Sequence, residues 1–296
     1  MAVMGYTALA DVDVARYNAK VRLQAAALVI HPQFFEQENV EGKTRQAVFT
    51  IFDKLTSTPS GTLLTGTYDL TDPTPETMTD SQVTVTAYEK GNAVAAMQGV
   101  RETAILDVVA AMQMAIAVNM AESLDNEAAY RLYSALTATK TLAGPMTPAE
   151  VLVIARTLEN NSVPVRDGGL HAAVISPYTK HDLFSDVSNL IGFLPVAQYT
   201  NPALAFGYEL GAWRGFRWVS GPSAYHATVT GQRHDYPIFF GAGAFGQANG
   251  YDPEIVINNG TRDLLQRVLE IGWKAQRGYG VINSNHVIQY DVIPNQ

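Results

Sequence analysis

The sequence predicts an α+β fold, because one long helical pattern lies among many short strand-like runs. Between residues 101 and 137, apolar residues recur at steps of three and four, and neither Pro nor Gly interrupts them. Residues 82–88 instead alternate small apolar residues with Thr or Tyr, which is the period of a strand. With 296 residues, 47% of them hydrophobic, the chain can bury a sizeable core in one large or two moderate domains.

The N-terminal part predicts an extended arm followed by a flap. Residues 1–44 scatter charge around Pro and carry one short helical pattern, at 19–30. Strands are expected at 46–52 and 82–88, and the segment between them, 53–81, is long for a loop inside a compact domain. An isolated two-stranded flap is marginally stable in water, so we expect a neighbouring subunit to cover it. A flexible surface loop is the alternative.

The helical pattern at 101–137 would extend for about 55 Å, as one helix or as two in tandem, which suggests a structural strut. Its stripe of Met and Ala is typical of packing against a sheet. Glycine and prolines at 143–148 end the pattern and mark a domain boundary. Thr147 then predicts an N-cap, with Pro148 and Glu150 in the first turn of a helix that runs to about residue 158.

The remaining sequence predicts short strands. Those after the boundary are expected at 171–176, 206–210, 217–220 and 237–240, with a helical turn at 179–185. The C-terminal part is expected to hold a strand at 254–258, a segment of undecided type at 264–271, and two closing strands at 280–282 and 286–292. This order of elements fits an α+β protein.

Composition excludes several classes of function. The net charge of −8 argues against a protein that binds nucleic acid by neutralising phosphates. The chain has no Cys, so disulfides, thiolate metal sites and a Cys nucleophile are excluded. Only 16% of residues are charged, against about 25% in ordinary domains, as in a surface covered by copies of the chain. An ordinary low-charge protein is the alternative. The first ten residues show no signal-peptide pattern, and the most apolar window, 108–120, is too short to span a bilayer.

One motif imitates a cofactor site. Gly241, Gly243 and Gly246 match the dinucleotide-binding pattern G-x-G-x-x-G and follow the strand expected at 237–240. That site also needs a helix beginning at the glycines and an acidic residue about 20 positions later. Gly250 and nearby Pro oppose such a helix, so we interpret the glycines as a tight turn between strands. A nicotinamide-dependent oxidoreductase using 241–246 is the alternative.

No other pattern predicts chemistry. The six histidines are scattered and form neither H-x-x-x-H nor H-E-x-x-H; they are His31, His171, His181, His226, His234 and His286. The sequence contains no G-x-S-x-G elbow, no P-loop and no EF-hand. We therefore expect no enzyme, and we assign no catalytic, cofactor-binding or metal-binding residue.

Four stretches of the second half resemble major capsid proteins of tailed bacteriophages with the Hong Kong 97-type fold. They read LHAAVISPYTKHDL at 170–183, GYELGAWRGFRWV at 207–219, IFFGAGAFG at 238–246 and IGWKAQRGYGVINSNHVIQYDV at 271–292. Together they cover about a fifth of the chain, and their order and spacing carry the resemblance. In the first half the agreement lies in the architecture alone.

The resemblance implies a division of the chain. An N-terminal arm would occupy 1–44, an extended two-stranded loop 45–90, and a peripheral domain with a long spine helix 91–143. An axial domain would occupy about 144–250, and the C-terminal strands at 251–296 would complete the peripheral domain.

The resemblance also implies a function. Copies of the chain would assemble as pentamers and hexamers into an icosahedral shell that encloses double-stranded phage DNA. The shell would form in the host bacterial cytoplasm, and the protein would belong to the virion. A separate scaffolding protein is expected, because the chain is too short for a scaffolding segment of its own, together with a portal and in some cases a cement protein. No cofactor and no membrane is implied. An encapsulin-type nanocompartment shell and a phage tail or decoration protein are the alternatives.

Overall fold

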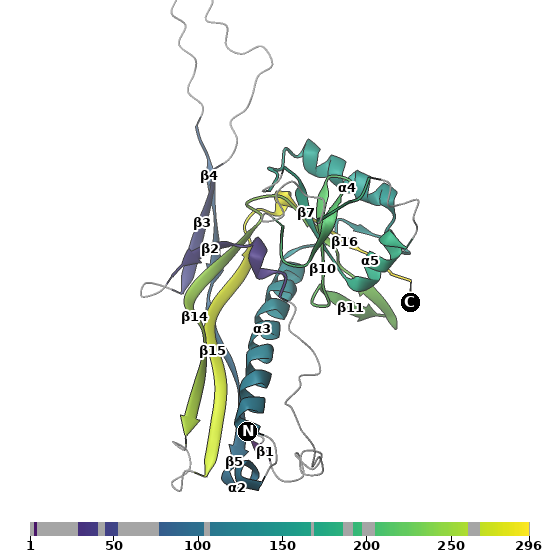
Figure 1. Cartoon of the computed structure of the whole chain (residues 1–296). Helices are drawn as coiled ribbons and strands as arrows, with labels where there is room; N and C mark the ends of the chain where they lie inside the picture. The colour runs from purple at the N-terminus through teal and green to yellow at the C-terminus, as the bar shows by residue number, and fades with distance from the viewer. Residues whose placement is uncertain are drawn as a thin grey trace, which may run out of the picture.

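The computed structural model describes residues 3–4, 29–40, 45–52, 77–103, 107–166, 169–185, 192–196, 205–259 and 267–295. Helices and strands are mixed along the chain, which confirms the predicted α+β class. The elements form two parts: a long ribbon of strands with a helix beside it, and a rounded part built on a second sheet (Figure 1). The predicted arm helix before residue 29 and the loop at 53–76 lie outside the described residues.

The ribbon is a five-stranded sheet in the order β1-β5-β15-β14-β2. Its central strands are the antiparallel β5 (Tyr88–Met97), β15 (Val268–Val281) and β14 (Phe245–Asn259). Short parallel strands lie on its two edges, β1 (Val3–Met4) beside β5 and β2 (Glu36–Asn39) beside β14. Segments from both ends of the chain therefore build one sheet.

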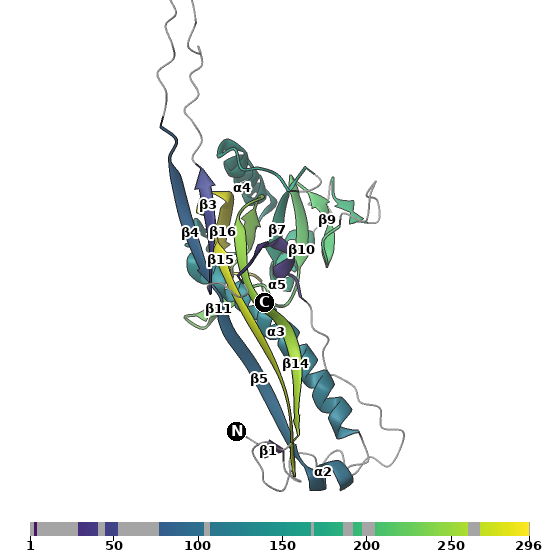
Figure 2. The same cartoon turned by 90° about the vertical axis from the view of Figure 1, so that its left-hand side faces the viewer.

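The predicted strut is two helices, α2 (Gln98–Thr103) and α3 (Val108–Ala135). The 28 residues of α3 extend about 42 Å along the ribbon, as both views show (Figures 1 and 2). Asp107 begins the helix, because its side chain accepts a hydrogen bond of 3.1 Å from the amide of Ala110. Apolar residues of α3 pack on β15 in one core cluster, which confirms the predicted contact with a sheet.

The rounded part is a seven-stranded sheet in the order β6-β16-β13-β7-β10-β9-β8. Its strands are β6 (Lys140–Thr141), β7 (His171–Ile175), β8 (Leu194–Pro195), β9 (Glu209–Trp213), β10 (Phe216–Ser220), β13 (Ile238–Phe240) and β16 (Val287–Asp291). Every residue of β7 is buried, because apolar clusters cover both faces of the sheet.

Two different helices cover the two faces of the seven-stranded sheet. On one face lies α4 (Pro148–Asn160), in a cluster that also holds Trp218. The Thr147 side chain accepts a hydrogen bond from the Glu150 amide, which confirms the predicted N-cap. On the other face lies the C-terminal end of α3. The ribbon and the rounded part therefore share the long helix.

Three smaller elements complete the fold. Strands β3 (Gln46–Phe52) and β4 (Asp80–Thr86) form an antiparallel hairpin, close to the predicted strands at 46–52 and 82–88. A second hairpin, β11 (His226–Val229) and β12 (Gln232–Asp235), was not predicted. The helical turn expected at 179–185 is α5 (Pro177–Phe184).

Several strand boundaries differ from those expected. The strand expected at 254–258 is the end of the 15-residue β14, and the one expected at 280–282 is the end of β15. The strand expected at 206–210 begins three residues later, at β9. Glycines broke the alternating pattern that sequence reasoning relied on, although they lie within the paired strands. The division of the chain at 44, 90, 143 and 250 stays a prediction.

Candidate functional site

The β3–β4 hairpin lies at the upper end of the ribbon (Figures 1 and 2). It has one packed face and one exposed face. On the packed face, Ala47 and Val85 lie opposite each other in the hairpin. They are buried against Val40, Ala87 and Ala248. This contact fixes the base of the hairpin on the ribbon.

The bare face of the hairpin carries apolar side chains. Val48 is 51% exposed and Phe52 is 61% exposed, although both belong to a regular strand. The seven residues of β3 contain no charge, and among the described residues β4 is the only strand that pairs with it. Exposed, uncharged edge strands are uncommon in soluble proteins, because they pair readily with other chains. The hairpin is therefore a candidate surface for contact with another subunit.

A buried pair anchors the chain where the arm reaches the spine helix. The amides of Ile30 and His31 donate hydrogen bonds of 3.0 and 2.7 Å to Oδ1 of Asp125, in the middle of α3. The His31 ring nitrogen Nδ1 lies 3.2 Å from the same oxygen. Burial by itself would raise the pKa of Asp125, but contacts with His31 and a hydrogen bond from Ser223 together outweigh burial and hold that pKa below its ordinary value. The contact fixes residues 30 and 31 on α3.

The next turn of the chain joins the arm to the rounded part. It is the 3-10 turn η2 (Pro32–Phe34). The guanidinium of Arg166 lies over the rings of Phe34, Phe206 and Phe240, at 5.6, 5.8 and 5.7 Å from their centroids. Such cation–π contacts strengthen with burial. Residues 30–39 therefore contact the spine helix, the rounded part and the ribbon in turn.

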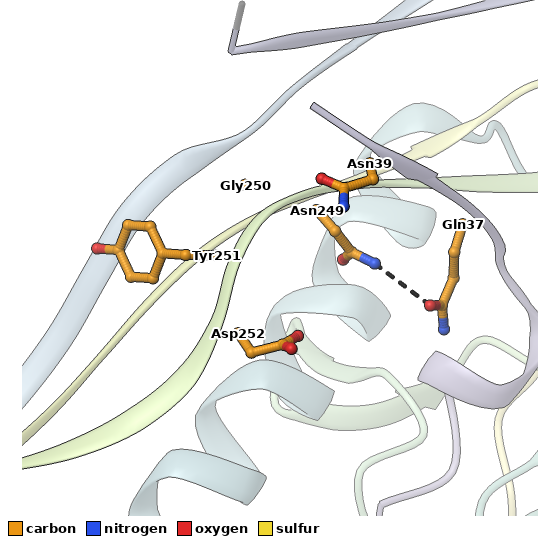
Figure 3. A pocket seen from close by; sticks show the side chains of 6 residues that line it. All are labelled: Gln37, Asn39, Asn249, Gly250, Tyr251 and Asp252. Atoms are coloured by element: carbon orange, nitrogen blue, oxygen red, sulfur yellow. Dashed lines mark hydrogen bonds between the residues drawn. The ribbon is translucent and has the colours of Figure 1, made fainter. Parts of the chain in front are cut away.

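The distal half of β14 is a second exposed surface. Ile255, Val256 and Ile257 are 41, 43 and 53% exposed, so both faces of the strand present apolar side chains. Beside this half, at the end of β2, lies a polar cavity of about 390 Å³ (Figure 3). It is lined by Gln37, Asn39, Asn249, Gly250, Tyr251 and Asp252. The strand β2 therefore covers only the first part of the β14 edge.

The glycine motif forms a turn between two strands. Strand β13 ends at Phe240 and β14 begins at Phe245, so a strand and not a helix follows the glycines. Gly243 has a φ of +67°, which favours glycine, and a Cβ on Gly241 would collide with the carbonyl oxygen of Pro164. The geometry required for a bound pyrophosphate does not form, and the predicted tight turn is confirmed.

Four of the six histidines each contact a different residue. His31 contacts Asp125, His171 contacts the Val163 carbonyl, His234 contacts Asp291 and His286 contacts the Ala242 carbonyl. Within the described ranges, no group of three metal-ligating side chains comes together. Also within these ranges, no helix is long and apolar enough to span a membrane.

Asp235 lies at the centre of a buried polar cluster that sequence reasoning missed. The fully buried Asp235 accepts hydrogen bonds from the hydroxyls of Ser176 and Thr179 and, at 2.7 Å, from Nε of Arg233. Ser176 also caps α5 by accepting from the Thr179 amide at 3.1 Å. These contacts join β12 to the start of α5, so the cluster has a structural explanation. The adjacent Ser-Pro pair at 176–177 was the signal for the cap, but nothing local pointed to Asp235.

Comparison with known proteins gave no match to any family model and no match among curated proteins. Solved structures do match over nearly their whole length. The capsid of Ralstonia phage GP4 has a TM-score of 0.74 at 14% identity, with 96% of both chains covered. The capsid of cyanophage P-SCSP1u has a TM-score of 0.69 at 12% identity, covering 96% of this chain and 94% of that one. The capsid of cyanophage Pam1 has a TM-score of 0.66 at 15% identity, covering 95% and 97%.

The alignments extend from near one end of the chain to near the other. The likeness therefore covers the ribbon, the long helix and the rounded part together. This chain therefore has the Hong Kong 97-type fold of tailed-bacteriophage capsid proteins.

Proposed function

We propose that this chain is the major capsid protein of a tailed bacteriophage. Its copies assemble as pentamers and hexamers into an icosahedral shell that encloses double-stranded DNA. The observation that carries the proposal is the match to the capsid of Ralstonia phage GP4 over 96% of both chains. The chain and that capsid protein correspond in extent as well as in fold, so the shared architecture accounts for nearly all of this chain.

The described surfaces support a role in assembly. The hairpin exposes Val48 and Phe52 among polar neighbours, and the far end of the ribbon exposes three consecutive apolar residues. In the assembled shell, the hairpin of one subunit lies over the spine-helix region of the next. Each such contact is weak, but a subunit makes several at once, and the high effective concentration within a shell makes the closed particle durable.

The role is structural, with no catalytic residue and no cofactor. The partners are further copies of the chain, a separate scaffolding protein, a portal and in some cases a cement protein. The shell forms in the host bacterial cytoplasm and becomes part of the virion. Because the subunit carries a net charge of −8, closure of the shell retains the DNA, and attraction to the wall does not.

The proposal is tested by shortening the hairpin. Phe52 and Asp80 are register partners at the end of the described hairpin, so a two-residue Asn-Gly turn can replace residues 53–79. We expect this variant to remain folded by circular dichroism but to form no closed shells when it is expressed with its scaffolding protein. Negative-stain electron microscopy of the unmodified chain under the same conditions is the control.

Two results would contradict the proposal. Shells of normal size from the shortened variant would show that residues 53–79 are not needed to hold neighbouring subunits together. A full-length chain that stays a soluble monomer under all conditions would remove the capsid function itself. A nanocompartment shell would instead yield closed particles that enclose an enzyme, which mass spectrometry of purified particles detects.

A further inference from the structure

Four tyrosines gather where the C-terminal end of α3 meets the β11–β12 hairpin (Figure 1). Tyr130 and Tyr133 lie about one turn apart on α3. Tyr225 directly precedes β11 and Tyr236 directly follows β12. The Tyr236 amide donates a hydrogen bond of 3.1 Å to the Tyr225 carbonyl, which closes the base of the hairpin. The tyrosine cluster therefore joins the spine helix to the rounded part.

Tyr133 and Tyr225 are the stacked pair of this cluster. Their ring centroids are 3.9 Å apart, and their ring planes differ by 18°. The contact of Tyr133 with Tyr236 is wider and tilted, at 4.7 Å and 59°, and so is that of Tyr225 with Tyr130, at 6.0 Å and 51°. Aromatic pairs usually keep their centroids about 4.5–7 Å apart, so the stacked pair is closer than ordinary packing requires.

Close stacking of two phenols favours one kind of covalent bond. Removal of one electron and the hydroxyl proton from a phenol leaves an unpaired electron shared between the oxygen and the ring carbons ortho to it. The orbital that holds this electron is perpendicular to the ring, so stacked rings present these orbitals to each other. Because the fold already holds both rings in place, coupling of two such radicals would be intramolecular and needs no encounter in solution.

The surroundings of the pair allow such a reaction. Tyr133 and Tyr225 are both partly exposed, so a small oxidant can reach them and water can accept their protons. Burial raises the pKa of Tyr225, so its phenol is protonated at neutral pH and gives up a proton with the electron. The chain has no cysteine, so no thiol of its own competes for the oxidant.

We propose that Tyr133 and Tyr225 form a dityrosine cross-linking site, at which a one-electron oxidant such as a peroxide-oxidised haem joins the spine helix to the rounded part. Two equivalents of oxidant take one electron from each phenol, and the two hydroxyl protons pass to water. A carbon–carbon bond forms between one ortho carbon of each ring. The hydrogen on each of these carbons then moves to the oxygen of its own ring, which restores both phenols. The product has lost two hydrogen atoms in total.

The bond would act as a staple within one subunit. It would fix the last turn of α3 on the base of the β11–β12 hairpin, and it would join positions about ninety residues apart in the sequence. Closing a long loop restricts the unfolded chain, so the staple raises the melting temperature. This inference goes beyond the proposed function, because it concerns a single subunit whatever its copies assemble into.

Peptide mapping of the oxidised subunit tests the site. The purified full-length chain is illuminated briefly with tris(bipyridyl)ruthenium, with persulfate as the final electron acceptor, and is then digested with trypsin. Basic residues separate the four tyrosines into four peptides, and peptides 132–140 and 218–233 hold one tyrosine each. We expect these two peptides to appear joined and lighter by two hydrogen atoms, together with the blue fluorescence of dityrosine.

Three variants identify the reacting rings. We expect Tyr133→Phe and Tyr225→Phe each to lower the yield of the joined peptides at least about tenfold, because phenylalanine keeps the ring but forms no phenoxyl radical. The matched control is Tyr130→Phe, which changes a tilted ring of the same cluster and should leave the yield within about twofold. Circular dichroism shows whether each variant is folded. Absence of the joined peptides from the unmodified chain, or an equal yield from Tyr133→Phe, would overturn the proposal.

Two further measurements test the staple in the unmodified chain. The yield should stay constant on about tenfold dilution, and the product should migrate as a monomer on a denaturing gel, because the bond lies within one subunit. The oxidised chain should melt several degrees higher than the untreated chain. Cross-linked dimers in place of the linked monomer, or an unchanged melting temperature of the linked monomer, would contradict a staple between α3 and the hairpin.

Discussion

Among single residues, Asp125 joins distant parts of the chain. It holds residues 30 and 31 on α3 by accepting hydrogen bonds from their two main-chain amides and by contacting the ring of His31. These residues lie more than ninety positions before Asp125 in the sequence. Its carboxylate is buried, so its replacement leaves donors in the interior without an acceptor. This is the mechanism by which a single substitution destabilises most strongly.

The pKa of Asp125 makes this contact dependent on pH. Its folded-state pKa lies below the ordinary value of 3.8, so the ionised form stabilises the fold above the unfolded-state pKa. That contribution is lost as the pH falls through the folded-state pKa. We expect Asp125→Asn to lower the free energy of unfolding by about 3 kcal/mol at pH 7, and by less near pH 3.

Urea denaturation of the subunit at both pH values measures this difference. The control is Asn126→Ala, which changes an exposed neighbour on the same helix and should stay within about 0.5 kcal/mol of the unmodified chain. A gap between Asp125→Asn and the unmodified chain that is the same at both pH values would argue against an ionised Asp125 as its source.

At the scale of elements, α3 is positioned by one buried stripe, and two of its methionines show this. Met112 is buried against the ribbon, whereas Met114, half a turn away, is exposed. We expect Met112→Ala to lower the free energy of unfolding by about 3 kcal/mol, because it leaves a cavity between helix and sheet. Met114→Ala removes the same atoms and should cost less than about 1 kcal/mol. Chemical denaturation of both variants checks the difference, and equal losses would contradict the assigned face.

The end of β4 passes close to the main chain of β15 at Gly278. A Cβ on Gly278 would collide with the main-chain carbonyl of Thr86, the last residue of β4. We expect Gly278→Ala to lower the melting temperature by several degrees, because main chain has to move to relieve the collision. Gly144→Ala is the control, since a Cβ there meets nothing within 4 Å. If calorimetry finds both variants equally stable, the close approach is not a constraint.

For the whole molecule, the net charge predicts whether the chain binds DNA. A chain with 20 basic and 28 acidic residues has too little positive charge to bind DNA through its phosphates. We expect the purified subunit to leave a double-stranded fragment unshifted in a gel at about 0.15 M salt, and no shift to appear with assembled shells. A shift that weakens steeply with added salt would show that electrostatic attraction holds the DNA.

Much of the fold could be predicted from local patterns. The cap at Thr147, the helix after it, the buried run of β7 and the long apolar stripe of α3 each depend on residues that are neighbours in sequence. The glycine turn at 241–246 could also be predicted, because Gly250 and Pro253, which oppose a helix after it, are close in sequence. Strand β14 was predicted too short and β15 was divided, since Gly250, Gly272 and Gly278 interrupt the alternation on which strand prediction depends.

The amino-acid sequence alone determined the α+β class, the strut, the capped helix and the absence of a recognisable catalytic motif, because periodicity and capping act over a few residues. Only the tertiary structure decided that Ile30 and His31 meet Asp125, that glycines in the ribbon admit crossing main chain, and that β2 pairs with β14. These features depend on which distant segments come together, and spacing along the chain carries no record of that.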